Sequence, residues 1–132
     1  MIRLLALSLV LMVGMTAFAA QDEDTPEAAK TRKLLETKIT VSWKDVPLKE
    51  VLEEIKEDHV KGIKFLVDTK GGVSQNQKLT FSGKEVTLAE AFDKMFTKNG
   101  LGYVVISKKG NAYNGLVQIK QGKERGYSAS KN

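Results

Sequence analysis

The sequence predicts an α+β fold in which two helices pack on small mixed sheets, in the order β-α-β-β-α-β-β. The main observation is a duplicated β-α-β unit whose two copies lie 40 residues apart. In residues 46–55 and again in residues 86–95, apolar residues recur at i, i+3, i+4 and i+7, which places them on one face of a helix. These residues are Leu48, Val51, Leu52 and Ile55 in the first copy, and Leu88, Ala91, Phe92 and Met95 in the second. A segment of alternating apolar and polar residues precedes each helix, as expected of a half-buried strand.

The first copy begins with a strand over residues 39–43. We expect its alternation to place Trp43 in the core, with a role in binding as the alternative. Pro47 suits the first position of the helix, where a missing N–H costs nothing. The helix is expected to end shortly before Gly62, which can supply a left-handed turn, and residues 63–67 then form a second strand.

A polar loop over residues 68–77 leads into the second copy, whose strand over residues 79–83 mirrors the first one. Thr87 and Glu90 have the T-x-x-E spacing of a capping box at the start of the second helix. Such a cap is worth about 1 kcal/mol. Gly100 is expected to end this helix.

Apolar residues predict the next strand over residues 101–105, and residues 108–111 have the composition of a hairpin turn. The return strand is expected over residues 113–119. From there on the sequence is polar, and we expect residues 121–132 to be a basic disordered tail. The predicted domain therefore spans residues 37–120.

The first 19 residues have the features of a secretory signal peptide. Arg3 supplies a positive charge, residues 4–15 form an uncharged apolar run, and the segment ends in Ala-Phe-Ala, as expected before a cleavage site. We therefore expect an exported protein, periplasmic or extracellular, and soluble without a stable membrane span after cleavage. The alternative is an uncleaved membrane anchor, for which the run is short. Residues 20–36 are expected to be a flexible lead, in which residues 27–36 could form a frayed helix.

The chain of 132 residues is long enough for one domain and carries a formal net charge of +5. The positive charge is concentrated near the C-terminus, in Lys120, Lys123, Arg125 and Lys131. We interpret this segment as a solvated tail, with attraction to an anionic envelope surface as the alternative. The export signal argues against nucleic acid as a partner. Since the chain has no cysteine, neither a disulfide nor lipid attachment through a cysteine is available, and the core must hold the domain alone.

No set of residues has the spacing of an active site or a metal centre. His59 is the only histidine and is expected to be half-buried or to cap a helix end, whereas a zinc site needs three or four converging ligands. A solvated helix face accounts for the acidic residues Glu50, Glu53, Glu54, Glu57 and Asp58. We therefore predict no enzyme, with no catalytic, cofactor-binding or metal-ligating residue and no cofactor.

The order of motifs resembles that of a known family. Residues 40–52 run from a strand through D-V-P-L into a helix with paired apolar residues, and residues 62–68 follow as a glycine and an apolar strand. The second half of the pattern lies in residues 79–81, 86–92 and 100–103. In this order and spacing, the stretch from Ile39 to about Ile119 resembles the secretin and TonB N-terminal short domain.

The resemblance implies the fold found at the periplasmic end of outer-membrane secretins and in the signalling domain of TonB-dependent receptors, where its role is protein–protein contact. No pore segment and no barrel follows in this chain, so we expect the fold and the binding of proteins rather than a channel. The implied function is an exported, non-enzymatic interaction module of the cell envelope, with partners in a secretin-type or TonB-linked system. The alternatives are a small exported ligand carrier or enzyme, and a component of a larger homo-oligomeric coat.

The predicted last strand is the candidate partner-binding edge, because the hairpin guarantees it only one neighbour. An unpaired strand edge can accept a strand of a partner protein. The residues expected at this edge are Tyr113, Leu116, Val117 and Ile119. The alternative is that the strand is internal to a sheet, or that Lys108, Lys109 and Lys120 shield its edge.

Overall fold

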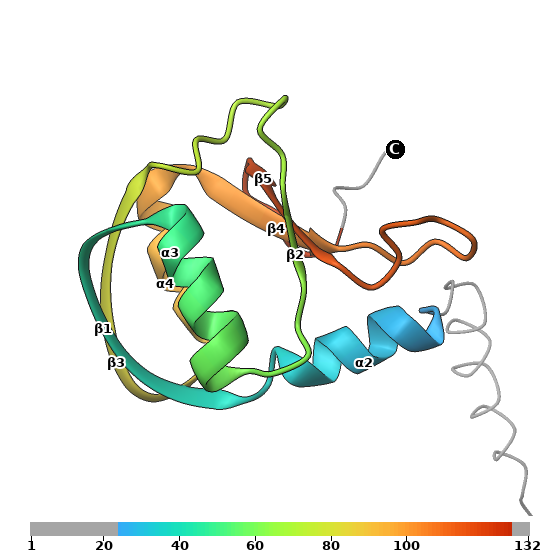
Figure 1. Cartoon of the computed structure of the whole chain (residues 1–132), viewed down its shortest axis with the longest axis horizontal. Coiled ribbons are helices and arrows are strands. Elements are labelled where there is room, and N and C mark those ends of the chain that lie inside the picture. The colour runs from blue at the N-terminus through green and yellow to red at the C-terminus, as the bar shows by residue number, and fades with distance from the viewer. Residues whose placement is uncertain (1–23, 128–132) are drawn as a thin grey trace, which may run out of the picture.

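The computed structural model describes residues 24–127 and shows an α+β fold (Figure 1). The helices are α2 (Pro26–Leu34), α3 (Leu48–Glu54) and α4 (Leu88–Asn99), and a π-helical turn (Ile55–His59) continues α3. The strands are β1 (Lys38–Pro47), β2 (Phe65–Val67), β3 (Lys78–Thr87), β4 (Leu101–Val105), β5 (Val117–Gln121) and β6 (Arg125–Gly126). The predicted fold class is confirmed, whereas α2, the π-helical turn and β6 are absent from the predicted order of elements.

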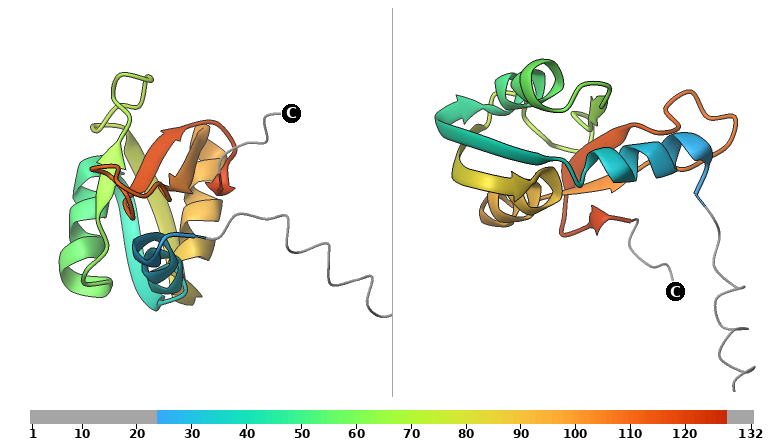
Figure 2. Two further views of the ribbon diagram at one scale, coloured as in Figure 1. Left: turned by 90° about the vertical axis from the view of Figure 1, so that its right-hand side faces the viewer. Right: turned by 90° about the horizontal axis from the view of Figure 1, so that it is seen from below.

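Helices α3 and α4 lie between two sheets (Figure 1). On one side, β1 and β3 form a two-stranded antiparallel sheet; on the other, a mixed sheet has the strand order β2-β5-β4-β6. In the mixed sheet, β5 is parallel to β2 and antiparallel to β4, and β6 is parallel to β4. The two helices stand side by side, one toward each edge of the β1–β3 sheet (Figure 2). Their apolar faces therefore meet in the layer between the sheets.

The duplication predicted from the sequence is visible in the hydrogen bonds that start the two helices. The N–H of Leu48 donates to the carbonyl of Gln77 at 2.8 Å, and the N–H of Leu88 donates to the carbonyl of Thr37 at 2.9 Å. In the second bond, the donor lies 40 residues later in the chain and the acceptor lies 40 residues earlier than in the first. Each helix start is therefore held by the residue that precedes the other strand of the two-stranded sheet.

The two long strands also carry a matching irregularity. Asp45 and Glu85 have positive φ angles of 54° and 52°, in the left-handed region that side chains other than glycine rarely adopt. The N–H of Asp45 donates to the hydroxyl of Thr80, and the N–H of Glu85 donates to the hydroxyl of Thr40, each at 3.0 Å. These reciprocal bonds relate the two halves of the domain by an approximate twofold symmetry.

The core forms around the apolar faces of α3 and α4, as the sequence predicts. Leu48, Leu52, Ile55, Leu88, Phe92 and Met95 are all buried in one hydrophobic cluster. Trp43 is buried as well, with its ring 6.5 Å from that of Phe81. Burial also raises the pKa of the Tyr103 phenol, which packs against the Phe92 ring at a centroid distance of 5.3 Å.

The predicted capping box at the start of α4 is confirmed. The Thr87 hydroxyl accepts from the N–H of Glu90 at 3.1 Å, and the Glu90 carboxylate accepts from the N–H of Thr87 at 2.9 Å. At the other end, Gly100 adopts the left-handed conformation with φ 69°. Residues close in sequence therefore accept hydrogen bonds from two N–H groups at the helix start. A local glycine likewise allows the chain to reverse at the helix end.

We expect Thr87→Ala to lower the free energy of unfolding by about 1 kcal/mol, because it removes the acceptor for the Glu90 N–H. Urea denaturation of the variant and of wild type measures this difference. Thr87→Ser keeps the hydroxyl and should stay close to wild type. Equal losses in the two variants would contradict a stabilising role for this cap.

Helix α3 begins and ends at residues that differ from those predicted. Strand β1 extends through Pro47, which precedes the first helical residue instead of occupying it. After Glu54 the helix widens into the π-helical turn, in which the N–H of Val60 donates to the carbonyl of Ile55 at 2.7 Å. Gly62 then has φ 97°, as expected for the chain reversal. The one-residue shift at Pro47 leaves Leu48, Val51 and Leu52 buried, as the sequence predicts.

The helix that residues 27–36 were expected to allow is present as α2, which is held on the domain and so differs from a flexible lead. The Thr25 hydroxyl caps this helix by accepting from the N–H of Ala28, whose side chain is buried. The Thr31 hydroxyl donates to the carbonyl of Gly115 at 2.6 Å. These polar contacts hold α2 on the domain although its apolar content is low. The predicted signal peptide lies outside the described residues.

The expected disordered tail over residues 121–132 is also wrong in its described part. Its strand β6 pairs with β4, and the guanidinium of Arg125 donates to the neighbouring Glu124 carbonyl and to three acceptors outside this segment. They are the Asp93 carboxylate at 2.9 Å, the Thr97 hydroxyl at 2.8 Å and the Leu101 carbonyl at 3.0 Å. Arg125, which was expected in a solvated tail, therefore links β6 to α4. The remainder of the expected tail lies outside the described residues.

Arg32 joins the two ends of the described chain. Its guanidinium donates to the Asp24 carboxylate at 2.7 Å and to the carbonyl of Gly126 at 2.8 Å, and it lies 3.9 Å from the centre of the Tyr127 ring. The hydrogen bond from Arg32 lowers the pKa of Asp24 below its ordinary value of 3.8. The ionised carboxylate therefore helps to hold α2 beside β6.

This depressed pKa predicts a pH-dependent contribution to stability. The contribution is present above pH 3.8, the ordinary value of the carboxyl, and is lost as the pH falls through it toward the lowered folded-state pKa. We expect wild type to melt at a slightly higher temperature than Asp24→Asn at neutral pH, and the two to converge as the pH falls from 3.8 toward the lowered folded-state pKa. Thermal denaturation across this range measures the difference. Equal melting temperatures at neutral pH would contradict the prediction.

Candidate functional site

The strand predicted as a partner-binding edge is internal to the mixed sheet. Strand β5 has β2 on one side and β4 on the other, so the prediction of an exposed edge is wrong. Val117 and Ile119 are fully buried, and Leu116 is half-buried. Tyr113 lies outside the strand, in the loop that joins β4 to β5, with 50% of its surface exposed. The structure therefore does not bring these four residues together on a free surface.

The longest unpaired edges lie in the two-stranded sheet, because the edge strands β2 and β6 of the mixed sheet are short. Within residues 24–127, β1 has only β3 as a neighbour and β3 has only β1, so each strand leaves one side of its backbone without a strand partner. Along the outer side of β3, a groove of about 570 Å³ separates this strand from helix α4. We call it the β3–α4 groove; it is lined by Thr80, Phe81, Ser82, Asp93, Lys94, Thr97 and Lys98.

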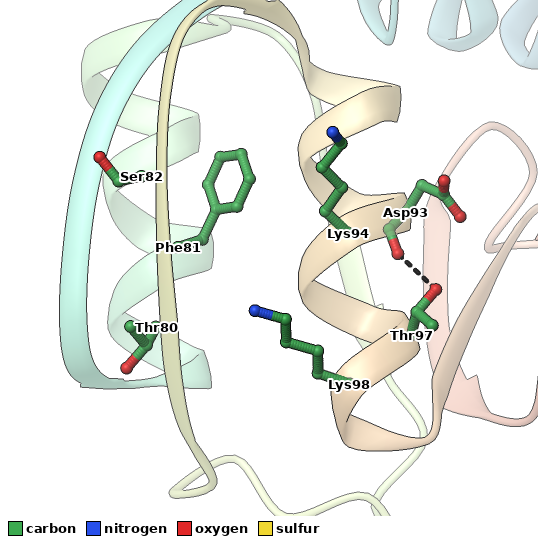
Figure 3. A pocket seen from close by; sticks show the side chains of 7 residues that line it. All are labelled: Thr80, Phe81, Ser82, Asp93, Lys94, Thr97 and Lys98. Carbon is green, nitrogen blue, oxygen red and sulfur yellow. Dashed lines mark hydrogen bonds between the residues drawn. The ribbon is translucent and has the colours of Figure 1, made fainter.

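The side chains of the β3–α4 groove come from both of its walls. Figure 3 shows Phe81 pointing from β3 toward α4 and Lys98 reaching from α4 toward β3, while the Lys94 side chain runs along α4. Phe81 is only half-buried, in contrast to the buried Leu79 two residues before it. The groove therefore combines an apolar surface with two positive charges.

The charged residues of the β3–α4 groove differ in their partners. Asp93 pairs with Arg125 at 2.9 Å, and its carbonyl accepts from the Thr97 hydroxyl at 2.6 Å. Lys94 and Lys98 are exposed, and neither has an ion-pair partner among the described residues. Two ammonium groups on successive helical turns, about 6 Å apart in their Cβ positions, can together attract an acidic segment.

The rest of the described chain has few residues that could catalyse a reaction or bind a metal ion. Its single histidine, His59, is half-buried, and a ring nitrogen lies 3.2 Å from the Glu54 carboxylate. Among residues 24–127, no three histidine or carboxylate side chains cluster closely enough to hold a metal ion. In the same part of the chain, each helix is too short or too polar to cross a membrane.

Sequence reasoning missed the β3–α4 groove. Phe81 corresponds to Val41 of the first copy, which is buried, whereas the structure leaves Phe81 half-exposed. The sequence analysis assigned no role to Lys94 or Lys98. The available signal was the spacing of these lysines, which puts them on one face of α4.

Comparisons of the chain with models of protein families, with curated proteins and with solved structures found no match.

Proposed function

We propose that this chain is a non-enzymatic protein-interaction module of the cell envelope, and that it binds a partner protein in the β3–α4 groove. The observation that carries the proposal is the position of this groove beside the unpaired side of β3. A segment of another protein can contact the strand backbone, the Phe81 ring and the two lysines at once. Proteins commonly recognise each other through free strand edges and grooves beside helices.

The shape of the groove favours a protein over a small molecule. Sites for small ligands are concave and bury most of the ligand surface. The β3–α4 groove is open to solvent along its length, and flexible lysine side chains form part of its wall. A partner that brings its own surface to cover Phe81 is better matched to this geometry.

The envelope location is supported by the sequence. The uncharged apolar run over residues 4–15, with Arg3 before it and Ala-Phe-Ala after it, supports export. The resemblance of the domain to the secretin and TonB N-terminal short domain supports a role in protein contact at the periplasmic side of the outer membrane. Partners in a secretin-type or TonB-linked system follow from the same resemblance.

Charge reversal in the groove tests the proposal. Tagged protein carrying Lys94→Glu and Lys98→Glu is expressed in the native host, cross-linked and purified from the envelope. We expect the recovery of its partner to fall by about tenfold or more, because like charges then face an acidic segment. Mass spectrometry of the recovered proteins measures this loss.

A matched control lies on helix α2. Lys30→Glu with Lys33→Glu makes the same change in net charge on exposed residues away from the groove. This control should retain the partner. If both variants retain it equally, the β3–α4 groove is not the binding surface.

A further inference from the structure

The two halves of the domain carry opposite charges at equivalent positions. Lys94 and Lys98 of the β3–α4 groove correspond, 40 residues earlier, to Glu54 and Asp58. The strands beside them are alike, with Thr-x-Ser at residues 40–42 and again at 80–82. The duplicated unit has therefore kept its fold while these two helix positions differ in sign; Glu50 and Glu53 correspond to Glu90 and Asp93, which have the same sign.

We propose that the partner bound in the β3–α4 groove is a second copy of this chain, whose acidic α3 face docks there. The acidic α3 face consists of Glu50, Glu53, Glu54, Glu57 and Asp58. This inference rests on the proposed function, because it identifies the protein that the groove binds. In this contact, the acidic α3 face of one molecule binds the β3–α4 groove of the next molecule.

The acidic α3 face is available for such a contact. Glu50, Glu53, Glu57 and Asp58 are exposed, and Glu54 keeps 40% of its side chain exposed despite its contact with His59. The exposed cations on the same segment are Lys49 and Lys56. Five carboxylates against two lysines and one histidine leave the face negative. It is thus complementary in charge to the unpaired lysines of the groove.

Within one molecule these surfaces cannot meet. The hydrogen bonds that start α3 and α4 relate the two helices by the approximate twofold symmetry, and the helices stand at opposite edges of the β1–β3 sheet (Figure 2). The acidic α3 face and the β3–α4 groove therefore point away from each other, so that only a different copy can join them. Such a contact uses two different surfaces and repeats head to tail, which gives a ring or a filament.

The half-exposed Phe81 supplies the apolar part of the contact. Alone, ion pairs at a surface contribute little, because water and salt screen them. A copy that covers Phe81 also removes apolar surface from water and partly desolvates the charges around it. The assembly should therefore form more readily at low ionic strength and dissociate as salt is added.

Sedimentation velocity of residues 20–132, which include every described residue, tests the first consequence. We expect the weight-average mass to rise with protein concentration at low ionic strength and to return to that of a monomer at high salt. A chain that stays monomeric at every concentration and ionic strength overturns the inference.

Exchange of the charges between the two surfaces tests the contact itself. One variant carries Lys94→Glu and Lys98→Asp, and the other carries Glu54→Lys and Asp58→Lys. Each variant alone has two surfaces of the same sign, so its self-association should weaken by about tenfold or more. In an equimolar mixture, each groove meets a face of opposite sign, and association should return. A variant with all four substitutions should also associate by itself.

Circular dichroism establishes that each variant is folded before it is compared. If the loss of the Glu54–His59 contact unfolds the second variant, Glu53→Lys with Glu57→Lys replaces it, because these exposed carboxylates have no ion-pair partner among the described residues. Absence of association in the mixture overturns the inference. If the lysine variant nevertheless loses an envelope partner that wild type retains, the proposed function stands and only its second-copy form fails.

Discussion

Replacing Phe92 with alanine is expected to lower the free energy of unfolding by about 3–5 kcal/mol. Phe92 is fully buried at the centre of an aromatic cluster, with its ring stacked on Phe96 at 4.8 Å and an edge contact to Phe65 at 6.0 Å. Truncation removes this apolar surface and leaves a cavity that rigid neighbours fill only in part. A domain of this size has about 5–15 kcal/mol of stability in total. The variant should therefore be close to unfolding at room temperature.

Phe81→Ala provides the matched control for this measurement. It removes the same side chain from a half-exposed position in the β3–α4 groove. The loss in urea denaturation should be much smaller than for Phe92→Ala, because the Phe81 ring is still partly in water in the folded state. Equal losses in the two variants would mean that the burial of Phe92 does not decide its contribution.

The prediction of the core succeeded because burial follows local periodicity. Residues at i, i+3, i+4 and i+7 face one side of any helix, whatever its neighbours are. Leu48 and Leu52 in α3 and Ile55 in the π-helical turn therefore lie where the sequence places them, as do Leu88 and Phe92 in α4. Helix caps are equally local, which is why the capping box at the start of α4 was also predicted.

The order of strands in a sheet has no comparable local signal. Strand β5 pairs with β4 through a hairpin, but its second neighbour β2 lies about 50 residues earlier in the chain. The sequence of β5 does not show whether the strand has one neighbouring strand or two. Its apolar residues Val117 and Ile119 are buried in the structure, but apolar residues occur in edge strands as well. The free edge was consequently assigned to the wrong strand, and the β3–α4 groove was missed with it.

The attachment of helix α2 to the domain and the presence of strand β6 were missed for a different reason. Their attachment depends on polar contacts between distant residues, such as Thr31 with Gly115 and Arg32 with Gly126. Hydrophobic patterns do not report such bonds, because donors and acceptors on a solvated surface look the same in sequence. Polar segments beside a domain can thus belong to its fold when their side chains reach backbone carbonyls.

The internal position of β5 predicts a large effect for proline at residue 118. Gln118 pairs with Leu66 of β2 on one side and with Val104 of β4 on the other. Proline removes the backbone N–H and places a ring where a neighbouring strand lies, so it is found almost only at sheet edges. We expect Gln118→Pro to destabilise the domain by an amount comparable with the roughly 3 kcal/mol that proline costs inside a helix.

Gln118→Thr separates this backbone effect from the loss of the glutamine side chain. Threonine keeps the N–H and suits a strand, so this variant should remain folded with a melting temperature near that of wild type. Gln118→Pro should lose the cooperative thermal transition, or show it at a much lower temperature, when followed by circular dichroism. A proline variant that melts like wild type would contradict the internal position of β5. It would mean that β5 has an unpaired edge, as β3 has in this structure.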